Sequence, residues 1–93
     1  MTTIIVFCET EDGENWAKSW KRGEGNRHEM FEKLGVKCRT FRDLNNHTST
    51  GVLFDIPDMN AFETFLETDE VKQAMAEDKL KLDTFRMLNE FTP

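Results

Sequence analysis

Residues 50–75 constrain the fold most, because a strand passes into a helix there at a defined point. Apolar side chains occupy alternate positions from Val52 to Ile56, the spacing that places one row of side chains on each face of a strand. Pro57 then has no N–H to donate to a sheet, and the side chain of Asp58 can accept a hydrogen bond from the first amides of a helix. The spacing predicts a strand over 51–56 and a helix that begins after Asp58.

Two apolar stripes follow this helix start at the three- and four-residue spacing of helices. The first stripe consists of Met59, Phe62, Phe65 and Leu66, and the second of Val71, Ala74 and Met75. Between the stripes, Thr68 or Asp69 can cap a second helix. We therefore expect two linked helices whose apolar sides lie on the sheet.

The first part of the chain predicts a strand and a broken helix. Residues Thr3–Cys8 are apolar on both faces, which is typical of a central strand. Trp16 and Trp20 then begin a helical stripe that Gly23 and Gly25 interrupt. Each glycine costs a helix interior about 1 kcal/mol relative to alanine, so the helix is expected to break there.

A second helical segment is expected to begin at Asn26 and to end at Gly35. Asn26 and Glu29 have the spacing of a variant capping box, and a glycine commonly ends a helix. The strand Val36–Leu44 follows, and its lysine and arginine side chains suit an exposed sheet edge. Residues 45–47 supply the turn into the central strand.

A fourth strand over Lys81–Phe91 completes the order βαββαβ. This order is the ferredoxin-like split βαβ pattern of the α+β class, in which helices cover one face of an antiparallel sheet. The alternation within the strands leaves four apolar side chains on the other face: Ile5, Phe7, Leu53 and Leu88. A further layer is needed to cover them.

Three segments resemble the dimeric α+β barrel superfamily: Asp55-Ile56-Pro57-Asp58, Phe62–Leu66 and Thr68–Met75. The resemblance covers nearly the whole chain and implies a single domain over residues 1–93. It implies that two sheets pack face to face across a two-fold axis, so that the four apolar side chains are buried in a homodimer. It also implies a ligand pocket between the sheet and the helices.

Members of this superfamily include cofactor-free antibiotic-biosynthesis monooxygenases, haem-degrading enzymes and polyketide cyclase-like proteins, and fold alone does not choose among them. The haem degraders use an Asn on the first strand and a Trp and a His in the second half of the chain. This sequence has no Asn in Thr3–Cys8 and neither Trp nor His after His47, which disfavours haem degradation. It also has no metal-ligand spacing, phosphate loop or serine elbow, so we expect no cofactor and no metal.

The composition disfavours several classes of partner. The net charge is −6, and an acidic surface repels nucleic-acid phosphates and anionic membranes. No stretch approaches the roughly 20 apolar residues of a membrane span, and no signal-peptide pattern is present. We expect a cytoplasmic protein in which Cys8 and Cys38 are reduced.

His28 is the candidate catalytic residue. It adjoins the apolar side of a short helix over the expected pocket, and histidine can transfer protons near neutral pH. The alternative is a solvated helix residue. The candidate ligand-binding residues are Trp16, Trp20, Arg27, Cys38 and Phe54.

Each of these ligand-binding candidates has an alternative interpretation. Trp16 and Trp20 stand one turn apart and could wall an apolar pocket, or they could simply pack in the core. Arg27 could bind a carboxylate or an enolate oxygen, or it could be exposed. Cys38 could reach the cleft as a nucleophile, or it could pack as a small apolar group.

Three hypotheses for function follow. The first is a homodimeric barrel that binds a small apolar or aromatic molecule and performs a cofactor-independent oxygenation or proton transfer. The second is a non-catalytic dimerisation or ligand-sensing module. The third is a monomeric ferredoxin-like regulatory domain, which would leave the four apolar side chains of the uncovered face exposed.

Overall fold

The computed structural model describes residues 2–21, 23 and 25–93. Four strands lie within these residues: β1 (Thr2–Thr10), β2 (Lys37–Arg42), β3 (Ser49–Ile56) and β4 (Leu80–Asn89). They are joined by four helices: α1 (Gly13–Ser19), α2 (Arg27–Glu32), α3 (Met59–Leu66) and α4 (Asp69–Glu77). The predicted order of elements is confirmed, with each of the two helical regions split in two.

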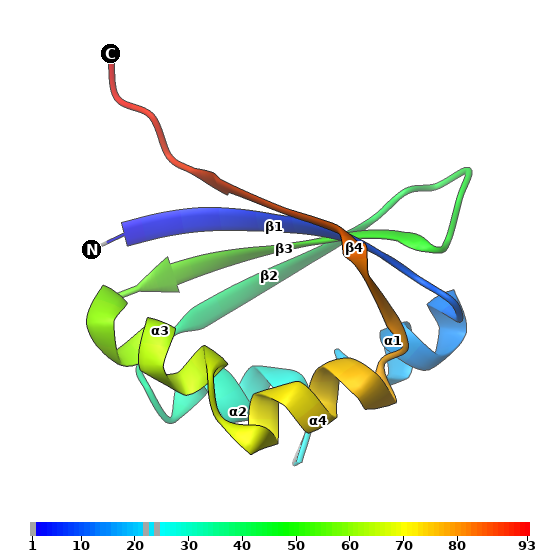
Figure 1. Ribbon diagram of the computed structural model, residues 1–93. Helices are drawn as coiled ribbons and strands as arrows, with labels where there is room; N and C mark the ends of the chain where they lie inside the picture. The colour runs from blue at the N-terminus through cyan, green and yellow to red at the C-terminus, as the bar shows by residue number, and fades with distance from the viewer. Residues whose placement is uncertain (1, 22, 24) are drawn as a thin grey trace.

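The strands form one open antiparallel sheet in the order β2-β3-β1-β4. Because neighbouring strands are antiparallel, β1 runs parallel to β2 with β3 between them, and β3 runs parallel to β4 with β1 between them. Figure 1 shows the helices gathered on one side of this sheet. The α+β class and the one-sided helix layer are thus confirmed, and the arrangement is compatible with a ferredoxin-like fold.

The helices that follow β3 begin where the sequence predicts. The Asp58 carboxylate accepts a hydrogen bond from the backbone N–H of Ala61 at 3.1 Å, which caps α3. The Thr68 hydroxyl accepts one from the N–H of Val71 at 3.4 Å, which caps α4. These caps satisfy amides that have no partner inside a helix, so local sequence sets both helix starts.

The predicted capping box of α2 is wrong. The side-chain amide of Asn26 donates to the backbone carbonyl of Lys21 and caps nothing in the helix. Glu29 reaches back to the N–H of Gly25, at 3.2 Å, instead of to that of Asn26. Asn26 therefore closes the loop that precedes α2, while Gly35, with φ of 73°, follows the helix as predicted.

The regular alternation predicted for the last strand holds from Arg86 to Asn89 and is broken before Arg86. Lys81 pairs with Glu9 and Arg86 pairs with Phe7, so that residues 82–85 lie opposite Cys8 alone. Met87 pairs with Val6 and faces the helices, as the alternation with Leu88 predicts. The bulge also turns Leu80 toward the helices, because Leu80 pairs with the helix-facing Thr10. The hydroxyl of Thr84 holds the bulge, because it accepts from the N–H of Glu9 at 2.9 Å and donates to the carbonyl of Lys81 at 2.6 Å.

The turn between β2 and β3 packs against the start of α1. A Cβ atom on Gly13 would lie 2.2 Å from the carbonyl oxygen of His47, so only glycine allows this approach. The Asp12 carboxylate caps α1 by accepting from the N–H of Asn15 at 3.1 Å. Together these contacts fix the helix that carries Trp16.

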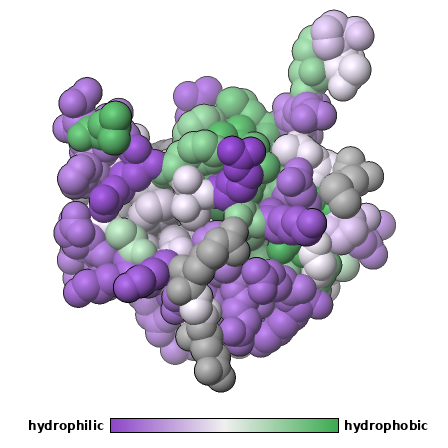
Figure 2. Space-filling view, turned by 180° about the vertical axis from the view of Figure 1, so that it is seen from behind, coloured by the Kyte–Doolittle hydropathy of each residue, from purple (hydrophilic) through white to green (hydrophobic). Residues whose placement is uncertain are grey.

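The sheet face away from the helices, called the open face below, carries an apolar centre. Two rows of side chains cross it, from β2 to β4: Arg39, Leu53, Ile5 and Leu88 in one, and Phe41, Gly51, Phe7 and Arg86 in the other. Phe7 is 39% exposed and Leu88 is 44% exposed. Figure 2 shows apolar side chains gathered in the upper part of the molecule, where the sheet lies, with hydrophilic ones over the helices below.

Candidate functional site

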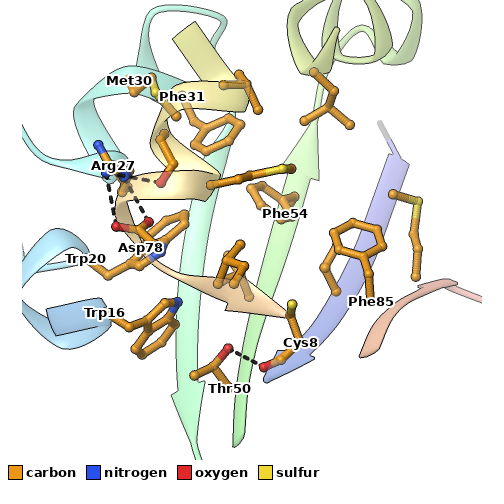
Figure 3. A pocket seen from close by; sticks show the side chains of 18 of the residues that line it. Cys8, Trp16, Trp20, Arg27, Met30, Phe31, Thr50, Phe54, Asp78 and Phe85 are labelled. Atoms are coloured by element: carbon orange, nitrogen blue, oxygen red, sulfur yellow. Dashed lines mark hydrogen bonds and ion pairs between the residues drawn. The ribbon is translucent and has the colours of Figure 1, made fainter. Parts of the chain in front are cut away.

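A cavity of about 80 Å³ lies between the sheet and the helix layer. Its wall takes side chains from all four helices and from β1, β3 and β4, and Figure 3 shows these side chains converging on it. The aromatic members are Trp16, Trp20, Phe31, Phe54, Phe62 and Phe85, and the thioethers are Met30, Met75 and Met87. The cavity is therefore an apolar site at the centre of the fold.

Trp20 connects the rings of the wall. Its ring centroid lies 6.0 Å from that of Phe31, in a stacked arrangement, and 6.4 Å from that of Phe54. Trp16 lies 6.3 Å away on the other side and is only 4% exposed. Aromatic pairs at these separations are mutually stabilising, so the wall is held by ring packing across three elements.

Among the described residues of the cavity wall, the charged side chains form a cluster built on Arg27. The guanidinium Nε lies 3.0 Å from Oδ2 of Asp78, and Nη2 lies 3.0 Å from Oδ1 of the same carboxylate. Nη2 also donates to Oε1 of Glu77 at 3.2 Å. The alternative of an exposed arginine is wrong, because the Arg27 side chain is 14% exposed and that of Asp78 is 5% exposed.

The pKa of Arg27 reflects two opposing effects. Burial of the guanidinium lowers it, but the hydrogen bonds and charges of Asp78 and then of Glu77 outweigh burial. The net result is a pKa above the ordinary value of arginine. Arg27 therefore stays charged and paired at any physiological pH.

A second hollow, called the polar groove below, lies on the other side of Arg27. It has a volume of about 250 Å³ and runs along the surfaces of α2 and α4. Its lining includes Glu29 and Lys33 from the α2 side, and Glu70, Gln73 and Glu77 from α4. The cavity and the polar groove share Arg27, Met30 and Ala74, so these three residues form the wall between them.

Cys8 and Thr50 form the floor of the cavity on the sheet. The hydroxyl of Thr50 donates to the backbone carbonyl of Cys8 at 2.8 Å, so it offers the cavity no free donor. Burial raises the pKa of the Cys8 thiol, and its contacts with Thr84 and the Lys81 backbone lower the pKa by less. The thiol is therefore protonated at neutral pH and is a poor nucleophile.

The raised pKa of Cys8 predicts a pH dependence of stability. The folded state holds this proton more tightly than the unfolded state, so the contribution is complete below the ordinary thiol pKa of about 8.5 and is lost as the pH rises through the raised value. Between pH 8 and pH 10 we expect the free energy of unfolding to fall more steeply for the natural protein than for Cys8→Ala, as measured by urea titration. An equal fall in the free energy of unfolding with pH for the natural protein and for Cys8→Ala would contradict this prediction.

The structure brings four of the six candidate site residues together. Trp16, Trp20, Arg27 and Phe54 all line the cavity. Cys38 is 4% exposed and packs in the core beside the cavity without lining it.

His28 is placed differently from both interpretations of the sequence. It is 6% exposed, so the alternative of a solvated residue is wrong. Its ring lies edge-on to that of Trp20, with centroids 5.3 Å apart, and it does not line the cavity. His28 thus contacts the cavity through Trp20.

Sequence reasoning named only part of the cavity wall, and Asp78 and Cys8 are among the lining residues that it missed. Cys8 shares the helix-facing row of β1 with Val6, so the alternation of that strand could have identified it. Asp78 follows α4 with no pattern of its own, and its partner Arg27 is 51 residues away in the chain. Ion pairs over such a separation are set by the fold.

The described part of the chain holds no group of three or more side chains suited to a metal ion. Of the helices in the same residues, none has the length and apolarity needed to cross a membrane. Comparisons of the chain with protein-family models, curated proteins and solved structures found no match. The cavity and the open face of the sheet are therefore the features on which a function can be argued.

Proposed function

We propose that the protein is a homodimeric α+β barrel that binds a small apolar or aromatic molecule between its sheet and its helices. The observation that carries the proposal is the cavity, whose described wall is mostly apolar, rich in rings and thioethers, and includes the charged pair of Arg27 and Asp78. Ligand sites commonly combine an apolar lining with a few placed polar groups. The order of the elements and the uncovered sheet face support the dimeric barrel.

The volume of the cavity limits the ligand to a small one. An engineered apolar cavity of about 150 Å³ binds benzene, and the cavity here measures about 80 Å³. Three methionines in the wall, Met30, Met75 and Met87, have flexible side chains that can move to enlarge it. A single ring or a short branched chain is the ligand that fits.

The open face supports a second copy of the chain as partner. Ile5 and Leu53 pair at its centre, and Leu88 and Phe7 extend the apolar surface on either side. Two sheets can pack face to face at about 10 Å and interdigitate such side chains. Arg86 and Asp55 lie on the same face and carry opposite charges, which a two-fold axis can bring together between copies.

Ligand sensing without turnover is the second candidate, and the chemistry of the wall favours it. Arg27 and Asp78 neutralise each other, and the Cys8 thiol is protonated. A proton-transfer enzyme would use His28, and replacement of His28 by Ala would then abolish turnover of a substrate while the fold is kept. Binding without turnover requires only the side chains of the cavity wall and no catalytic residue.

The two tryptophans give a direct test of binding. The chain has only Trp16 and Trp20, and both line the cavity. We expect benzyl alcohol to cause a saturable change in tryptophan emission. Ala74→Leu should weaken this binding at least about tenfold, because Ala74 lines the cavity and a larger side chain fills it.

Ala76→Leu is the matched control for this test. Ala76 lies on the same helix, is exposed and does not line the cavity, so its binding curve should match that of the natural protein. A linear, unsaturable change in emission would contradict the proposal. Equal binding by Ala74→Leu would place the ligand elsewhere and contradict it as well.

A further inference from the structure

We infer that the cluster of Arg27, Glu77 and Asp78 makes the cavity select amines over acids, so that the ligand is a small aromatic or apolar molecule with a cationic head. The inference rests on the proposed function and names the class of ligand that the same cavity takes. It reverses the expectation that Arg27 would bind a carboxylate or an enolate oxygen.

The first step is the state of the Arg27 guanidinium. Its planar fork is already occupied in the bidentate manner by Asp78, with two N–O distances of 3.0 Å. Glu77 and the carbonyl of Ala74 accept further hydrogen bonds from Nη2, at 3.2 and 3.5 Å. One cation thus faces two carboxylates, and the cluster has a net charge of −1.

An incoming carboxylate could bind the Nε–Nη2 edge of Arg27 only by displacing Asp78 from it. The Asp78 side chain is 5% exposed, so displacement would leave a buried carboxylate without its cation. Loss of one partner from a buried ion pair is strongly unfavourable because the remaining charge is neither hydrated nor paired. The cluster therefore opposes an acidic ligand in both its charge and its geometry.

The polar groove extends the same sign of charge beyond the wall. Glu29, Glu70 and Glu77 line it, against Lys33 and Arg27, so its described lining residues have a net charge of −1. Because Arg27, Met30 and Ala74 separate the groove from the cavity, a molecule that spans this wall has one end in each hollow. An apolar body would lie in the cavity, and an ammonium group would lie beside Glu77, whose side chain is 57% exposed.

The rings of the cavity favour the same ligand. Trp16 and Trp20 line the cavity, and indole is the best partner for a cation among aromatic side chains. An ammonium group near these rings gains cation–π attraction, and at the wall the carboxylates of Asp78 and Glu77 outweigh the charge of Arg27. An anion gains no such attraction from the rings, and at the wall it meets a cluster with a net charge of −1.

Three probes with the same ring test this selection: benzylamine, benzyl alcohol and benzoate. Dissociation constants are measured at pH 7 by tryptophan emission. We expect benzylamine to bind tightest and benzoate at least about tenfold more weakly than benzylamine, a ratio that added salt reduces. Glu77→Gln/Asp78→Asn leaves Arg27 unneutralised, and in this variant benzoate should bind tighter than benzylamine.

Two further variants make the test decisive. Glu63→Gln/Glu67→Gln removes the same charge from exposed positions away from the cavity and should keep the natural order of the probes. If the Asp78 substitution prevents folding, Glu77→Gln alone should reduce the ratio of the benzylamine and benzoate affinities about threefold, because the cluster becomes neutral.

The outcomes separate the inference from the proposed function. Binding of benzyl alcohol together with equal binding of benzoate and benzylamine would overturn the charge selection and leave the cavity as a ligand site. An unchanged order in Glu77→Gln/Asp78→Asn, or a reversed order in Glu63→Gln/Glu67→Gln, would also overturn the selection. Failure of all three probes to bind would overturn both.

Discussion

Phe7→Lys is expected to abolish the proposed dimer. Phe7 lies on the open face of the central strand β1, and its ring packs over Gly51. It is 39% exposed, so the isolated chain can tolerate a lysine whose ammonium reaches water. In a face-to-face dimer the same position is buried in both copies, and two ammonium groups would enter one apolar interface.

The expected weakening of the dimer is large because the substitution is present in both copies. Burial of a phenylalanine side chain contributes about 1.5–3 kcal/mol, and a two-fold interface contains it in each copy. The dissociation constant of the dimer should rise by about 10²- to 10⁴-fold. Sedimentation velocity over a range of protein concentrations measures this change, and native mass spectrometry gives the masses directly.

Leu44→Lys is the matched control for Phe7→Lys. Leu44 lies in the turn between β2 and β3 and is 91% exposed, so the same charge is added away from the open face. Leu88→Lys, on the open face of β4, should again give a monomer. A natural protein that is monomeric at every concentration would refute the dimer, as would a Phe7→Lys variant that dimerises normally.

Local sequence was sufficient to predict most of the fold. The boundary at Pro57 depends on neighbouring residues alone: a proline that ends pairing, and Asp58, which caps the next helix. The spacing of apolar residues in the strands and helices then predicts which side chains face the core. Phe54, Phe62 and Trp16 lie where these periods place them.

The departures from prediction arise from contacts between distant residues. Thr84 bonds to Glu9, 75 positions away, and this contact holds the bulge that breaks the alternation of β4. Asn26 has the sequence position of a helix cap, but the loop before α2 uses its side chain to close on Lys21. A local pattern shows what a side chain can bond, and the tertiary fold selects among these options.

The candidate site divides along the same line. The rings of the wall are predictable from the spacing of apolar residues, because an apolar stripe at helical spacing is buried against the sheet. The net charge of the wall is not predictable in this way, because the sequence does not show that Arg27 in α2 lies beside Asp78, the residue after α4. Arg27 in isolation suggests an acid as ligand, and its pairing with Asp78 and Glu77 is the observation behind the inferred preference for amines.

Phe62→Ala is expected to cause the largest loss of stability. Phe62 is 1% exposed, and its ring centroid lies 5.2 Å from that of Phe54 and 6.0 Å from that of Phe31. Removal of a buried phenylalanine ring costs about 3–5 kcal/mol, part of which is the cost of the cavity left behind. Phe62 already borders a cavity, so the new space joins it and the neighbouring rings cannot collapse to fill it.

Urea unfolding at a fixed protein concentration measures this loss as a lower midpoint with an unchanged slope. Phe91→Ala is the matched control, because Phe91 is 82% exposed and its removal should change stability by no more than about 0.5 kcal/mol. The enlarged cavity should at the same time bind benzyl alcohol more tightly than the natural protein does, since the ring of the ligand can replace the ring that was removed. A loss below about 1 kcal/mol would mean that the site collapses, and the aromatic wall would then be less rigid than its ring contacts indicate.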